Sequence, residues 1–97
     1  MRRIDRIFKM NCWMDVFEQS YFGGRMRRLF GPVRVEPVLA RSVIVGPQAW
    51  VQMIARHRKA NRQIVLQLQP KSLIPDLGAS LRGAKLKSAT ITCRKGK

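Results

Sequence analysis

The sequence is poor in the residues that most often carry out catalysis. Its 97 residues include only five Asp and Glu, two Cys and one His, and these form no zinc-ligand set and no paired-carboxylate motif. His57 lies between basic residues, which favours a surface position over a role as a general base. GxGxxG, GxSxG and phosphate-loop motifs are absent as well. We therefore expect no enzyme, no metal site, no cofactor and no small-molecule substrate.

The sequence also gives little sign of a membrane span or of export. No apolar run approaches the about 20 residues that a membrane-spanning helix needs, and no secretory hydrophobic region follows Met1. The two cysteines, Cys12 and Cys93, are far apart and belong to no CxxC motif. A disulfide between them is one alternative, but the pattern favours two free thiols in a reducing compartment.

Basic residues are abundant. The chain has 20 Lys and Arg, and its formal net charge is +15. Residues 1–46 contribute nine basic and four acidic side chains, net +5, whereas residues 47–97 contribute eleven and one, net +10. A small domain with this charge repels itself unless an anion neutralises it, and the usual anion is a phosphate backbone. The charge predicts a nucleic-acid partner, contacted mainly by the second half.

The N-terminal part is expected to form a helix and an extended arm. Residues 2–22 place Ile4, Ile7, Phe8, Met14 and Tyr21 on one helical stripe. This stripe would pack on the same protein or dock on a neighbour, and two glycines end the helix. Residues 25–37 indicate an extended basic connector, whose arginines beside Phe30 could contact a phosphate and stack on a base. A solvated linker is the alternative.

The remaining residues predict alternating strands and helices. Residues 38–45 and 63–69 are rich in β-branched or alternating apolar side chains, which is typical of strands. Residues 47–60 follow helical spacing, and several cations gather at the end of that helix. Residues 77–82 fit either a helical turn or a short strand, and residues 85–93 read as a final strand. No internal repeat is visible.

Several short motifs resemble a thioredoxin-like family of small mitochondrial ribosomal proteins and an accessory subunit of respiratory complex I. The resemblance covers about residues 38–93. It rests on Trp50-Val51, Lys59-Ala60-Asn61, Ile64-Val65-Leu66, the Pro75, Ala79, Leu81 and Gly83 spacing, and Lys85, Ala89 and Ile91. The family normally adds a C-terminal helix, which is missing here.

This resemblance implies an α+β fold in two parts. Residues 1–37 would form the N-terminal helix and extended basic arm. Residues 38–97 would form a thioredoxin-like β-α-β-β module with a four-stranded mixed sheet. Residues 77–82 would then be a strand, and the peptide bond between Ile74 and Pro75 would be cis.

The resemblance and the charge together predict a structural component of the mitochondrial ribosome, located in the matrix and bound to ribosomal RNA and neighbouring ribosomal proteins. The first alternative is the complex I accessory subunit, a protein-interaction module without RNA. The second is a free-standing DNA- or RNA-binding regulator. The basic residues expected to contact RNA phosphates are Arg25, Arg27, Arg28, Arg56, Arg58, Lys59, Arg62, Lys85, Lys87, Arg94 and Lys95.

Overall fold

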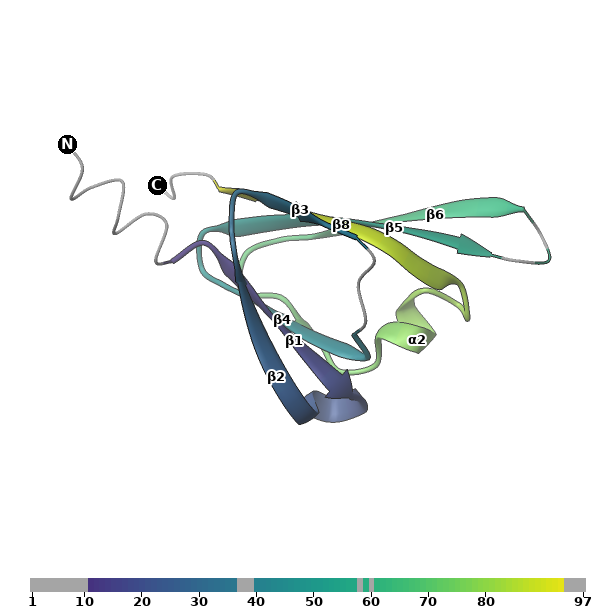
Figure 1. The fold of residues 1–97 in the computed structure, drawn as a ribbon, viewed down its shortest axis with the longest axis horizontal. Helices are drawn as coiled ribbons and strands as arrows, with labels where there is room; N and C mark the ends of the chain where they lie inside the picture. Colours follow the sequence, from purple (N-terminus) through teal and green to yellow (C-terminus); the bar gives the residue numbers. More distant parts are fainter. Residues whose placement is uncertain (1–10, 37–39, 58, 60, 94–97) are drawn as a thin grey trace.

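Two four-stranded antiparallel sheets face each other across an apolar core in the computed structural model, which describes residues 11–36, 40–57, 59 and 61–93 (Figure 1). The first sheet has the order β2-β1-β4-β7 and consists of β1 (Trp13–Gln19), β2 (Gly23–Phe30), β4 (Ser42–Val45) and β7 (Leu73–Ile74). The second has the order β3-β8-β5-β6 and consists of β3 (Val33–Val35), β5 (Ala49–His57), β6 (Arg62–Leu68) and β8 (Lys85–Cys93). A 3-10 turn, η1 (Ser20–Phe22), follows β1, and a short helix, α2 (Leu77–Ser80), precedes β8.

The strand order shows a duplication that the sequence does not. Read from its other edge, the second sheet has the order β6-β5-β8-β3. Its strands β6, β5 and β8 take the places that β2, β1 and β4 have in the first sheet, and β3 takes the place of β7. Strands β1 to β4 are therefore one repeat and β5 to β8 a second, and each repeat places its third strand in the sheet of the other. The exchange ties the two repeats into one sandwich.

The helix predicted over residues 47–60 is wrong, because this segment forms the central strand β5. Its buried side chains alternate strictly with exposed or half-buried ones, from Ala49 through Val51 and Met53 to Ala55. The spacing of four that suggested a helix is also compatible with a strand, since every fourth residue of a strand lies on the same face. Pairing with β6 on one side and β8 on the other decides the outcome.

The N-terminal helix is wrong as well, wherever the structure describes it. Residues 13–19 form β1, in which Met14 and Val16 point into the core. The predicted helical residues 2–10 lie outside the described residues. Within the segment predicted to be an extended connector, the described residues 25–36 contribute to strands of the sandwich instead, because β2 pairs with β1 and β3 pairs with β8.

These pairings correct the α+β, thioredoxin-like expectation. Every strand pair in the described part of the chain is antiparallel, so there is no mixed sheet there. Residues 77–80 form a helical turn rather than the strand that the resemblance implied. The cis peptide within the described residues is Gly31–Pro32, and the expected cis bond before Pro75 is wrong. The predicted strands 63–69 and 85–93 do coincide with β6 and β8, and 38–45 ends in β4.

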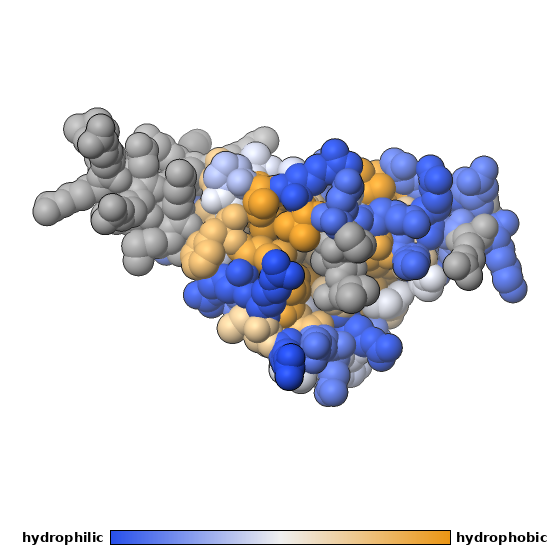
Figure 2. Space-filling view, viewed as in Figure 1, coloured by the Kyte–Doolittle hydropathy of each residue, from blue (hydrophilic) through white to orange (hydrophobic). Residues whose placement is uncertain are grey.

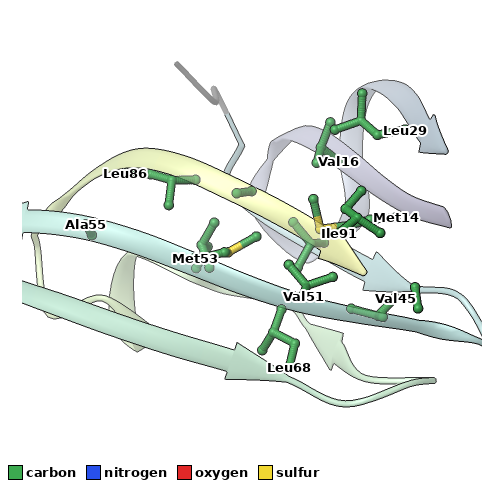
Figure 3. Close-up of a cluster of buried hydrophobic side chains, with 14 of the residues drawn as sticks. Met14, Val16, Leu29, Val45, Val51, Met53, Ala55, Leu68, Leu86 and Ile91 are labelled. Carbon is green, nitrogen blue, oxygen red and sulfur yellow. The ribbon is translucent and has the colours of Figure 1, made fainter. Parts of the chain in front are cut away.

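The core lies between the inner faces of the two sheets. Figure 3 shows Met14 and Val16 from the first sheet facing Val51, Met53 and Ile91 from the second. Towards the β5–β6 hairpin the sheets diverge, and α2 fills the space between them (Figure 1). Leu77, the first residue of α2, and Leu81, which directly follows the helix, are buried against this core. No helix among the described residues is long and apolar enough to cross a membrane.

A disulfide joins the two sheets where the first strand begins and the last one ends. Cys12 and Cys93 are bonded across a sequence separation of 81 residues, so the expectation of two free thiols is wrong. The backbone of Gly31 lies against this bond, because a Cβ there would come within 2.9 Å of both sulfurs. The cysteines are distant in sequence, and they meet because β1 and β8 lie in facing sheets.

Candidate functional site

Basic residues gather where the β5–β6 hairpin projects past the start of β8. Figure 1 shows this hairpin reaching beyond the rest of the sandwich, and Figure 2 shows hydrophilic residues covering the same end of the molecule. A hollow of about 420 Å³ opens there. Its lining, which we call the cationic notch, consists of Arg56, His57, Asn61, Gly83, Lys85 and Lys87.

Strand register creates the notch. Arg56 of β5 lies directly across from Lys85 of β8, so two cations that are 29 positions apart become neighbours. The register of the same pair of strands shifts between Ile54 and Ala55, and this bulge places Lys87 as an extra residue beside them. Both lysines and Arg56 are exposed. The chain thus presents three cationic side chains around one hollow.

The turn before β8 leaves the notch accessible. Gly83 has φ of +79°, a conformation that glycine adopts without strain, and a Cβ at this position would meet no atom within 4 Å. A ligand can therefore approach the backbone here as well as the cationic side chains.

The three cations have no anionic partner in the described part of the chain. The ion pairs found there join Arg28 to Asp15 and Arg34 to Glu36, both away from the notch. Unit charges 4 Å apart interact by about 1 kcal/mol in water and about 4 kcal/mol near a protein surface. Like charges gathered around one hollow repel one another and a bound anion relieves this repulsion, and phosphate oxygens accept hydrogen bonds from both arginine and lysine.

His57 contributes a polar atom to the same place. Its Nδ1 is buried and has no hydrogen-bond partner among the described residues. Buried polar atoms are nearly always hydrogen-bonded, so this nitrogen is an exception. The ring lines the notch beside the expected phosphate contacts, and neither described ion pair places a carboxylate there to orient a general base.

The structure brings together part of the predicted RNA-binding set. Arg56, Lys85 and Lys87 line the notch. Arg62 pairs across the hairpin with His57, and Lys59 lies in the turn between the two strands; both are exposed. The predicted contacts at Arg58, Arg94 and Lys95 lie outside the described residues.

The remaining predicted residues, Arg25, Arg27 and Arg28, lie on β2 in the other sheet. Arg28 already has partners, because its Nε and a terminal nitrogen donate to the two carboxylate oxygens of Asp15 at 2.7 and 2.9 Å. Its guanidinium also stacks 4.0 Å from the centroid of the Trp13 ring. The hydrogen bond to Asp15 raises the pKa of Arg28 above its ordinary value. Arg28 therefore stabilises the outer face of the first sheet.

Sequence reasoning missed a second hollow, on the outer face of the second sheet. It measures about 180 Å³, and its lining consists of Trp50, Val51, Gln52, Gln67, Leu68 and Thr92. The side chains that face outward here are an indole, two amides and a hydroxyl. The alternation of glutamine with apolar residues in β6 was visible, but which glutamine meets which residue of β5 depends on register.

Comparisons with known proteins identify the architecture. No protein-family model matches the chain, and no curated protein matches it in sequence. A structure described as "Evolution of the eye lens beta-gamma-crystallin domain fold" matches with a TM-score of 0.70 and 17% identity, over 88% of this chain and 89% of that one. IPSE/alpha-1 from Schistosoma mansoni eggs matches with a TM-score of 0.58 and 14% identity, over 90% and 93%.

At these identities the likeness concerns the fold alone. Both neighbours have all-β folds and neither is named as a ribosomal protein, so the expected membership of the thioredoxin-like family is wrong. The ribosomal assignment rested on that resemblance and loses its support with it. The chain is similar in architecture to the all-β βγ-crystallin domain.

Proposed function

We propose that this protein binds nucleic acid through the cationic notch, by contacts to backbone phosphates. The observation that carries the proposal is the convergence of Arg56, Lys85 and Lys87 on one hollow without a described carboxylate beside them. The net charge of +15 supports it, because each cation that meets a phosphate releases condensed counterions. Such contacts position a protein on its ligand without selecting a sequence.

The mitochondrial ribosome and respiratory complex I entered as expectations through the thioredoxin-like resemblance. The fold contradicts that resemblance, so neither is retained in the proposal. The disulfide between Cys12 and Cys93 supports a different setting, since such bonds persist mainly in oxidising compartments. We propose that the protein works in such a compartment.

Two variants of equal charge test the notch. The notch variant combines Arg56→Gln, Lys85→Gln and Lys87→Gln. The control variant combines Arg25→Gln, Arg27→Gln and Lys71→Gln, which are exposed and not part of the notch. Each removes three cations and lowers the net charge from +15 to +12.

Fluorescence anisotropy with a labelled oligonucleotide measures the effect across a salt series. Three lost phosphate contacts correspond to about 100-fold weaker binding near 0.1 M salt and to a shallower salt dependence, by about two units of slope for a single strand. The control variant should weaken binding only a few-fold, through the general field. Equal losses in the two variants, or no binding by the unmodified protein, would overturn the proposal.

A further inference from the structure

The chemistry of the side chains on the outer face of the second sheet changes step by step along the strands. Its strands β5, β6 and β8 contain no Asp or Glu. Residues that face each other across these strands form rows on the outer face. Beginning at the notch, the rows are Lys85–Arg56–Gln63, then Ile54–Val65 with the buried Ser88 across from Ile54, then Thr90–Gln52–Gln67, and finally Thr92–Trp50. Cations thus lie at one end, apolar side chains follow, and amides, hydroxyls and an indole lie at the other end.

The far end of this face has the chemistry that an unpaired base requires. The 180 Å³ hollow lies there, and the Trp50 indole beside it is 37% exposed. Amide side chains both donate and accept hydrogen bonds, as do hydroxyls, so Gln52, Gln67 and Thr92 can pair with the edge of any base. An indole ring adds a stacking surface, worth about 1–3 kcal/mol per base.

The distance between the two ends suits a short single strand. Trp50 and Arg56 are six residues apart along β5, which corresponds to about 20 Å at roughly 3.3 Å per residue. Between them, Val65 is 46% exposed and lies across from Ile54, which offers apolar surface to intervening bases. Single-strand sites on other β-sheet proteins accommodate about 4–16 nucleotides. A ligand of this length reaches both hollows at once.

We propose that this face binds single-stranded nucleic acid, with phosphates in the cationic notch and a base in the hollow beside Trp50. The inference rests on the proposed function and adds the strandedness of the ligand. In a duplex the base edges that would meet the glutamines are already paired, so a duplex would use only the notch. The shared chemistry of RNA and DNA single strands fits the face, and binding of either one satisfies the proposal.

The test compares two ligands and two variants on the intact protein. The ligands are a 12-nucleotide single strand, made as RNA and as DNA, and the DNA duplex of the same sequence. The face variant combines Gln52→Ala, Gln67→Ala and Thr92→Ala, which are all exposed and leave the charge unchanged. The notch variant of the previous section is its counterpart.

We expect single strands to bind at least about 10-fold more tightly than the duplex at equal salt. The face variant should weaken single-strand binding about 10-fold and duplex binding less than twofold, whereas the notch variant should weaken both. The chain has two tryptophans, so Trp13→Phe leaves Trp50 as the single tryptophan. Its emission should be quenched by single strands and unchanged by the duplex.

The outcomes separate the two proposals. If single strand and duplex bind alike, and the face variant binds like the unmodified protein while the notch variant does not, the inference fails and the proposed function stands. If neither ligand binds, or the notch variant binds as well as the unmodified protein, the proposed function fails and this inference fails with it.

Discussion

The two hairpins that occupy corresponding places in the duplicated fold differ in shape. The first, β1–β2, folds back at η1, where Tyr21 and Phe22 have φ of 57° and 63°. Ser42 of β4 holds this corner, because its hydroxyl accepts from the Phe22 N–H at 2.9 Å and donates to the Gln19 carbonyl at 2.7 Å. The Phe22 ring then packs edge-on against Phe17.

The second hairpin, β5–β6, has no such corner. It is paired without a register shift from Val51–Leu68 to His57–Arg62 and runs straight out of the body (Figure 1). Ser88 of β8 lies across from Ile54 of β5, just as Ser42 of β4 lies across from Phe17 of β1. One topology thus supports both forms: a folded hairpin closes its own surface, and a straight one presents cations and an outer face to a ligand.

The largest expected effect concerns the bond that couples the two repeats. The double variant Cys12→Ala with Cys93→Ala removes the disulfide, which in the unfolded chain closes a loop across a sequence separation of 81 residues. Loop-closure entropy predicts a loss of about 4–5 kcal/mol in the free energy of unfolding. Urea denaturation of the oxidised protein and the double variant measures this loss, and reduced unmodified protein is the control. Coincident unfolding curves would show that strand exchange alone couples the repeats.

The second prediction contrasts one arginine from each hairpin. Arg28→Ala leaves the Asp15 carboxylate, which is only 5% exposed, without its partner. Because the Arg28 side chain is itself 41% exposed, we expect a loss of about 2 kcal/mol rather than the larger cost of a fully buried pair. Binding to nucleic acid should be unchanged. Arg56→Ala should do the reverse, with stability altered by less than about 0.5 kcal/mol and binding weakened several-fold.

The cost of Arg28→Ala comes from the unpaired carboxylate, so Asp15→Asn added to it should restore part of the stability. The raised pKa of Arg28 keeps its guanidinium charged throughout the neutral range. Thermal unfolding at neutral pH is therefore a sufficient measurement. If Arg28→Ala weakens binding as much as Arg56→Ala does, the distinction between the two hairpins is wrong.

Sequence patterns predicted β6 and β8 better than β5, the strand that lies between them. Alternation in residues 63–69 and β-branched content in 85–93 identified β6 and β8, because those signals are local. The helix predicted at 47–60, and the described part of the one predicted at 2–22, were wrong because apolar residues spaced four apart suit one face of a helix and one face of a strand alike. Only partners on both sides of β5 decide between them, and partners are a property of the whole fold.

The candidate site was predictable in composition and not in arrangement. Charge density after residue 46 singled out Arg56, Lys85 and Lys87, although Arg56 was expected at the end of a helix. Their convergence depends on the β5–β8 register, including the bulge. The hollow beside Trp50 depends on the register that places Gln52 across from Gln67. Neither register is readable from one sequence.

The smallest expected effect tests the folded corner itself. Ser42 is fully buried, and Ser42→Ala leaves the Phe22 N–H and the Gln19 carbonyl without the hydroxyl that bridges them. Losing these two bonds should cost about 1–2 kcal/mol in urea denaturation. Ser88→Ala is the matched control from the other repeat, where no corner needs holding, and we expect a change below about 0.5 kcal/mol. Equal losses in the free energy of unfolding at the two serines would mean that a serine hydroxyl stabilises both repeats alike. The lack of a folded corner like that at Ser42 would then not explain why the second hairpin is straight.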